Sequence, residues 1–196
     1  IPNPPKWHPE ICTGEHTMMV LRRASELSDK LSIRFAALCH DLGKSLTPPE
    51  QWPSHRGHEK SGLPLVKAIC ERIRVPNHIK LLCLQVCEFH LHVHKARELK
   101  ATTILKLFDQ LNAWNKPDDF HDFLLVCQAD FQGRKDLESS PYLQKDYLTE
   151  LYNGASQIIA KPFVEQGLKG IEIKHAISNA RLDAIKVHKS QFKWPD

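Results

Sequence analysis

Apolar side chains recur at helical spacing along nearly the whole chain. Between Thr13 and Ser28, Met19, Val20 and Leu27 fall on one face of a helix. The same periodicity predicts further helices over residues 32–43, 58–73, from 76 through 89, 102–114, 118–133, 140–160 and 170–189. Thr13, Ser32 and Asp118 are the expected N-caps of their helices. Pro64 predicts a kink in the helix over 58–73, or a helix that restarts with Pro64 in its first turn.

No alternating run rich in Val, Ile and Thr predicts a strand, so the expected fold is an all-α helical bundle. We expect a core over residues 1–160, of which 1–12 is a Pro-rich linker, and a basic helical C-terminal extension over 161–196. The join is expected between Pro162 and Gly170. The opening sequence, IPNPPKW, suggests a piece of a longer protein or a processed protein.

The composition is that of a soluble globular protein, with 41% hydrophobic and 26% charged residues. No apolar run approaches the ~20 residues that a membrane-spanning helix needs, and the first residues do not resemble a signal peptide. Six cysteines form no CxxC pair and lie among apolar residues, which favours small buried side chains over a zinc knuckle or disulfides. A reducing, cytoplasmic location is therefore expected.

The net charge of +4 is concentrated near the C-terminus. Residues 161–196 contain seven Lys or Arg and four Asp or Glu, which gives a net charge of +3. Two interpretations remain open: a basic face that contacts the phosphates of a nucleic acid, and an ordinary solvated helix face.

Two His-Asp pairs are present, His40-Asp41 and His121-Asp122, where about 0.7 would occur by chance. The second pair lies at a predicted helix start, where an Asp favours the helix dipole, and we interpret it as structural. The first pair ends an apolar helix, Phe35–Cys39, that should be buried. A carboxylate there is costly unless it is paired or binds a metal. The pair therefore predicts a metal site, with a buried His-Asp hydrogen bond as the alternative.

Two further polar residues interrupt apolar helix faces. His16 stands in a first turn, before Met18-Met19-Val20-Leu21, and Asp130 stands near the end of a mostly apolar helix. Together with His40 and Asp41 they supply two imidazoles and two carboxylates from three helices. This donor set suits Mn, Fe, Co, Ni or Mg better than structural zinc.

The series His16, His40-Asp41 and Asp130 resembles the H…HD…D signature of the HD superfamily of metal-dependent phosphohydrolases. The stretch 34–44, RFAALCHDLGK, resembles that family's central helix, and 57–62, GHEKSG, resembles the start of its next conserved helix. These motifs cover residues 8 to 133. The resemblance implies a helical bundle of the HD-domain type with the four residues as metal ligands.

A narrower resemblance covers more of the chain. The opening HPE…EHT over residues 8–17, the HD segment, and the tail GLKGIEI over 167–173 with Arg181-Leu182 resemble the C-terminal half of the bacterial multifunctional CCA-adding enzymes, a family of tRNA nucleotidyltransferases. That family's nucleotidyltransferase motif, a Gly-rich loop followed by an Asp-x-Asp strand, is absent from this sequence. The resemblance implies a nucleotidyltransferase part N-terminal to this chain in the full protein, but no polymerase activity in the chain itself.

The activities that this resemblance implies are hydrolysis of 2′,3′-cyclic phosphates, hydrolysis of 2′-nucleotide monoesters and general phosphatase activity, all dependent on Ni, Mn, Co or Mg. Lys44 is expected either to neutralise a substrate phosphate or to be a solvated lysine at a helix end. His58 is a candidate proton donor or phosphate contact. By resemblance to HD enzymes with two metals, His58 and His90 are also candidates for a second ion.

The remaining histidines are interpreted as structural or exposed. His92 and His94 are expected to be exposed imidazoles at a polar helix end. The others are expected at the surface: His8, His55, His78, His121, His175 and His188.

Three functions therefore remain in view. The first is a phosphohydrolase domain of a tRNA-processing enzyme, acting on nucleotide or tRNA 3′-end phosphates, with tRNA bound through residues 161–196. The second is a helical tRNA-binding platform without catalysis, and the third is a free-standing HD nucleotidase. The complete four-ligand set favours the first.

Overall fold

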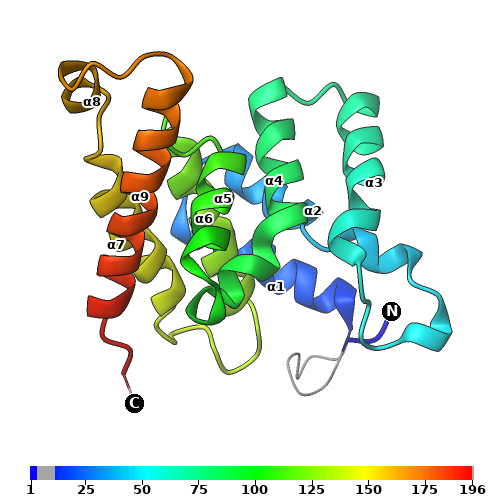
Figure 1. The fold of residues 1–196 in the computed structure, drawn as a ribbon. Coiled ribbons are helices and arrows are strands. Elements are labelled where there is room, and N and C mark those ends of the chain that lie inside the picture. The colour runs from blue at the N-terminus through cyan, green and yellow to red at the C-terminus, as the bar shows by residue number, and fades with distance from the viewer. Residues whose placement is uncertain (4–11, 196) are drawn as a thin grey trace. The chain divides into compact units, whose positions relative to one another are not determined.

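The computed structural model describes residues 1–3 and 12–195, and helices dominate these residues (Figure 1). The elements are α1 (Thr13–Leu27), α2 (Leu31–Cys39), the 3-10 turns η1 (Leu42–Leu46) and η2 (Pro49–Gln51), α3 (His58–Arg72), α4 (Asn77–His94), η3 (Ala96–Glu98), α5 (Ala101–Gln110), α6 (Pro117–Gln132), α7 (Leu143–Ser156), α8 (Lys161–Glu165) and α9 (Ile171–Gln191). One isolated bridge joins Pro2 to Cys12, and no strand is formed in the described ranges. The predicted all-α fold is confirmed.

The chain folds into two compact units that do not follow the predicted boundary. The first unit contains residues 1–94 and 118–142, and the second contains 95–117 and 143–196. Residue 160 therefore falls inside the second unit, because α9 packs along both α7 and α5. Most of the predicted linker over 1–12 lies outside the described residues.

Small side chains let the helices of the first unit approach closely. The α2 helix packs on α1 and α4, and α3 and α4 lie side by side (Figure 1). Ala24, Ala36 and Ala37 are fully buried at these contacts, as are the thiols of Cys83 and Cys87 on α4. The α6 helix contributes larger buried side chains, among them Phe123 and Leu124. Five of the six cysteines are buried and none is disulfide-bonded, as predicted.

Aromatic side chains form much of the second unit. Phe108 of α5 and Tyr147 of α7 are fully buried, and the ring of Tyr152 stacks on Trp114 at 5.6 Å. The guanidinium of Arg181 on α9 lies 4.0 Å above the Trp114 ring. Part of the predicted basic extension is therefore committed to packing.

Several predicted helix ends were wrong by a residue or more. Cys12, not Thr13, is the N-cap of α1, and the Thr13 hydroxyl bonds to Asn3 instead. The α2 helix begins at Leu31, before the predicted cap Ser32, and α6 begins at Pro117, before Asp118. The α3 helix continues through Pro64. Proline removes one N–H donor there, and Pro64 itself lies at the exposed surface.

The described helices include none with the length and apolar composition needed to cross a membrane.

Candidate metal centre

The four residues predicted as metal ligands come together inside the first unit. His16 lies in the first turn of α1, His40 is the C-cap of α2, Asp41 follows it, and Asp130 lies near the end of α6. All four are buried, with at most 5% of the residue exposed. Helices that are far apart in the sequence therefore deliver two imidazoles and two carboxylates to one buried region.

The first group consists of His16, His40 and Asp130, whose ligand atoms lie within 4.8 Å of one another. Oδ1 of Asp130 lies 3.0 Å from Nε2 of His16 and 3.7 Å from Nε2 of His40. Two nitrogens and one carboxylate oxygen at these separations can bind the same divalent ion.

The second group consists of Asp41, His58 and His90, whose ligand atoms also lie within 4.8 Å of one another. Oδ1 of Asp41 lies 3.1 Å from Nε2 of His58 and 3.7 Å from Nε2 of His90. Its other oxygen, Oδ2, lies 3.2 Å from Nε2 of His40. Asp41 thus presents one oxygen to the second group and the other to a histidine of the first.

Hydrogen bonds fix the orientation of the imidazoles. Nδ1 of His40 donates to the carbonyl of Ala37 (2.7 Å), Nδ1 of His58 to that of His55 (2.8 Å), and Nδ1 of His90 to that of Val86 (2.9 Å). A carbonyl can only accept, so Nδ1 carries the hydrogen and a neutral ring leaves a lone pair on Nε2. This is the arrangement that protein side chains adopt when Nε2 binds a metal.

Three buried atoms at the junction of the two groups have no hydrogen-bond partner among the residues that the structure describes. They are Nε2 of His40, Oδ1 of Asp41 and Nε2 of His58. Leaving such atoms unsatisfied costs about 1 to 3 kcal/mol each, and more for a charged group. All three are atoms of the kinds that can bind a metal, and a bound cation would remove this cost.

Glycine allows α3 to approach the His-Asp pair. A Cβ at Gly43 would overlap the carbonyl oxygen of His58 and lie 2.8 Å from the amide nitrogen of Gly62. Only a glycine permits this contact between η1 and the first turns of α3. The approach of the two backbones is what brings His58 to Asp41.

Burial and neighbouring charges set the ionisation of the centre. Burial alone would raise the pKa of Asp41, but His40 and Lys44 outweigh it and hold that pKa well below its usual range. Burial opposes ionisation of Asp130 in the same way, and His94 and His40 hold its pKa well below normal. Burial lowers the pKa of His90 to about 3, so this ring is neutral near pH 7. Ionised carboxylates and a neutral imidazole are the protonation states that bind metals.

Lys44 is buried beside the carboxylate of Asp41. Its ammonium group lies 2.6 Å from Oδ2 of Asp41 and donates to the amide oxygen of Asn3 (3.0 Å). The interpretation of Lys44 as a solvated lysine was therefore wrong. Asn3, which the sequence analysis did not single out, is fully buried at this contact.

His94 was also misjudged. It was expected to be an exposed imidazole, but its Nε2 lies 2.6 Å from Oδ2 of Asp130 and its Nδ1 lies 2.7 Å from the hydroxyl of Tyr142. Its spacing of four residues from His90 on one helix was the available signal. Nothing in the local sequence pointed to Tyr142, which follows α6.

The other histidines divide as follows. His121 is exposed, its neighbour Asp122 forms an ion pair with Lys30 at 2.8 Å, and neither residue of the pair belongs to the two groups. His78 and His175 are exposed as predicted, and His188 is half-buried. His55 was predicted at the surface, which was wrong: it is 1% exposed, and its Nε2 donates to the carbonyl of Pro2. His92 is half-buried and belongs to neither group, and His8 lies outside the described residues.

Comparison with known proteins identifies the family to which the chain is similar. Residues 13–114 match the family model described as "HD domain", a span that includes His16, His40, Asp41, His58 and His90 and ends before Asp130. The chain is 52% identical over 185 residues to the Multifunctional CCA protein of Pseudoalteromonas atlantica (strain T6c / ATCC BAA-1087), covering 94% of the chain and 46% of that relative. It is 48% identical over 187 residues to the Multifunctional CCA protein of Aliivibrio salmonicida (strain LFI1238), covering 95% and 46% respectively. The chain thus spans slightly less than half the length of these relatives. No solved structure was found to match it.

Proposed function

The chain belongs to the HD-domain family, and on this premise we propose that it is a phosphohydrolase whose centre binds two divalent ions. The observation that carries the proposal is the pair of buried ligand groups that meet at Asp41. His16, His40 and Asp130 would hold one ion, and His58 and His90 the other. Asp41 would bind both, with one oxygen toward each group.

The donor set fits this assignment. Every ligand is an imidazole nitrogen or a carboxylate oxygen, and no thiol belongs to either group. Such a set suits Ni, Mn, Co or Mg and leaves coordination positions for water and substrate. When bound, ions of this kind lower the pKa of a water molecule and polarise a phosphoryl oxygen.

The protein's own groups prepare the site for an anionic substrate. Backbone carbonyls orient His40, His58 and His90, so little reorganisation accompanies binding. The ammonium group of Lys44 pairs with the carboxylate of Asp41, and it would be the cation that contacts a substrate phosphate bound beside Asp41. When only the first ion is bound, His58, whose Nε2 lies 3.1 Å from Oδ1 of Asp41, would be able to pass a proton to a leaving group.

We further propose that the substrates are 2′,3′-cyclic phosphates and 2′-nucleotide monoesters, including those at a tRNA 3′ end. The support is the identity to two relatives named Multifunctional CCA protein. Because the chain covers 46% of each relative, a nucleotidyltransferase part is expected in the full protein, N-terminal to this chain.

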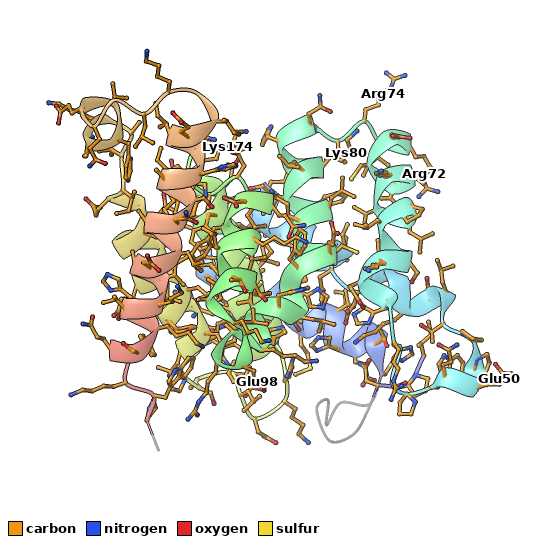
Figure 2. The ribbon with its side chains drawn as sticks, in the orientation of Figure 1. Glu50, Arg72, Arg74, Lys80, Glu98 and Lys174 are labelled. Carbon is orange, nitrogen blue, oxygen red and sulfur yellow. The ribbon has the colours of Figure 1, made fainter. Side chains whose placement is uncertain are left out.

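A tRNA-binding role can accompany catalysis. The exposed lysines of residues 161–196 are one candidate surface. A second basic group, Arg72, Arg74 and Lys80, surrounds the connection between α3 and α4 (Figure 2). A binding platform alone would not need two carboxylates buried among histidines, which favours the enzyme.

The test is metal reconstitution of the 196-residue chain. After chelation, Ni, Mn, Co and Mg would be added separately, and hydrolysis of 2′,3′-cyclic AMP, 2′-AMP and 3′-AMP would be measured in parallel. We expect metal-dependent hydrolysis of the first two and little of 3′-AMP. A folded chain that hydrolyses none of the three with any of these metals would contradict the proposal.

Metal content separates one ion from two. Wild-type chain should bind about two equivalents, and His16→Ala and His58→Ala should each lose about one. His78→Ala, which changes an exposed histidine of α4, is the matched control and should bind as the wild type does. A single equivalent in the wild type would reduce the proposal to one ion.

A further inference from the structure

The two oxygens of Asp130 have different surroundings. Oδ1 faces the first ligand group, 3.0 Å from Nε2 of His16 and 3.7 Å from Nε2 of His40. Oδ2 lies on the other side of the carboxylate, 2.6 Å from Nε2 of His94. One oxygen is therefore directed at a metal position and the other at a fourth histidine.

The hydrogen bonds of His94 run in the opposite sense to those of His40, His58 and His90. Nε2 of His16 also forms a hydrogen bond with Asp130, at Oδ1 (3.0 Å), so what distinguishes His94 is the hydroxyl of Tyr142 at its Nδ1. Its Nδ1 meets the hydroxyl of Tyr142 at 2.7 Å, and its Nε2 meets a carboxylate. A carboxylate can only accept, and an unprotonated Nε2 at 2.6 Å would repel it. Nε2 of His94 therefore carries a hydrogen and donates it to Asp130, and the ring can accept the Tyr142 hydrogen at Nδ1.

Packing holds Tyr142 in place. It is 4% exposed, and its ring stacks on Phe131, the residue after Asp130, with centroids 5.0 Å apart. Burial raises its pKa well above the usual value for tyrosine, so the phenol keeps its hydrogen near pH 7. Tyr142, His94 and Asp130 thus form a chain of hydrogen bonds that ends at the first ligand group.

We propose that His94 and Tyr142 are positioning residues that hold Asp130 with only Oδ1 directed at the first ion, and that His94 is not itself a ligand. The inference rests on the proposed metal centre. It explains why two histidines four residues apart on α4 have different roles: His90 presents a lone pair to an ion, and His94 presents a hydrogen to a ligand. Outer hydrogen bonds of this kind typically change metal affinity by about 10- to 100-fold.

The test is titration calorimetry with Mn, together with the number of bound ions, on the 196-residue chain and three variants. His94→Ala should weaken one of the two binding events about 10- to 100-fold and leave the other within about 3-fold. His94→Gln, whose side-chain amide can still donate to Asp130, should recover most of that affinity. Tyr142→Phe keeps the ring and should weaken the same event by roughly 3- to 10-fold. His78→Ala is the control on the same helix.

The outcomes separate this inference from the proposed function. Absence of Mn binding by the folded wild type overturns both. Wild-type affinity in His94→Ala overturns the inference alone. A loss of about one equivalent in both His94→Ala and His94→Gln also overturns it, because His94 would then be a ligand. Should His94→Ala fail to fold, Tyr142→Phe and His94→Gln decide: unchanged affinity in Tyr142→Phe contradicts its positioning role.

Discussion

The ammonium group of Lys44 lies 2.6 Å from Oδ2 of Asp41, and both residues are only 5% exposed. A buried ion pair contributes little when compared with a well-packed apolar replacement, but removal of one partner leaves an uncompensated charge. Lys44 therefore occupies the place of a counter-ion to the carboxylate that the two proposed metal sites share.

Lys44→Met should destabilise the metal-free chain by about 3 to 5 kcal/mol, because Asp41 loses its buried partner. Added Mn should restore more stability to this variant than to the wild type, since a cation then compensates Asp41 and no longer competes with Lys44. Thermal unfolding with and without Mn measures both effects. Equal unfolding temperatures of variant and wild type in the absence of metal would show that the ion pair does not matter.

Asp41→Ala should reduce hydrolysis of 2′,3′-cyclic AMP by at least about 100-fold while the helical circular dichroism spectrum is retained. The carboxylate contacts both ligand groups, so its loss affects both proposed ions. Activity near the wild-type level with saturating Mn or Ni would mean that the assigned centre is wrong.

The second His-Asp pair provides the matched control. Changing His121 and Asp122 together to Ala should leave hydrolysis within about 2-fold. The cost in stability should be below about 1 kcal/mol, because the pair of Asp122 with Lys30 is a surface ion pair. A loss of activity equal to that of His40→Ala would mean that the catalytic His-Asp pair had been assigned to the wrong helix.

The glycine after the His-Asp pair offers a prediction that involves no ligand. Gly43→Ala should destabilise the chain by about 1 to 3 kcal/mol or more, because the added Cβ overlaps the His58 carbonyl. It should also weaken Mn binding by separating His58 from Asp41. Gly14→Ala is the control, since among the described residues its Cβ would meet only Sγ of Cys12, at an ordinary 3.8 Å. Equal unfolding temperatures of the two variants would contradict this account.

Periodicity was sufficient to predict the helices and to identify His16, His40, Asp41 and Asp130 as polar residues on faces that should be buried. Their burial follows from the faces on which they lie, which is a property of the local sequence. Helix ends were less predictable. Thr13 and Ser32 look like N-caps, but neither helix has a side-chain cap, and the Thr13 hydroxyl bonds to Asn3 instead.

Residues that reach the centre through tertiary packing could not be predicted in this way. Asn3 contacts Lys44 across 41 positions of sequence, and Tyr142 contacts His94 across 48. His55 donates to the carbonyl of Pro2 across 53 positions of sequence, a contact that no local pattern specifies. The packing of α9 on α5 and α7, which places residues 95–117 in one compact unit with residues 143–196, depends on tertiary contacts in the same way.

The basic C-terminal segment is less uniform than its charge suggested. Arg181 lies over Trp114, and Lys189 donates to the carbonyl of Arg97 and the hydroxyl of Tyr147. These two residues support the second unit and are poor probes of RNA binding. Lys169, Lys174 and Lys186 are exposed, and they are the better choice.

If the segment 161–196 is an RNA-facing surface, changing Lys169, Lys174 and Lys186 to Glu should weaken tRNA binding by about 10-fold or more. It should also reduce the slope of log K against log salt concentration by roughly two to three, because about one counter-ion is released for each phosphate contact. Hydrolysis of 2′,3′-cyclic AMP should stay within about 2-fold of the wild-type rate, since every proposed ligand belongs to the other unit.

The matched control makes the same change of charge at Arg72, Arg74 and Lys80, around the α3–α4 connection (Figure 2). A larger loss of tRNA affinity in this control than in the tail variant would indicate that the RNA contact lies in the first unit. Unchanged tRNA affinity in the tail variant would identify the segment as a solvated helix face, and an equal loss in both variants would indicate that only net charge matters.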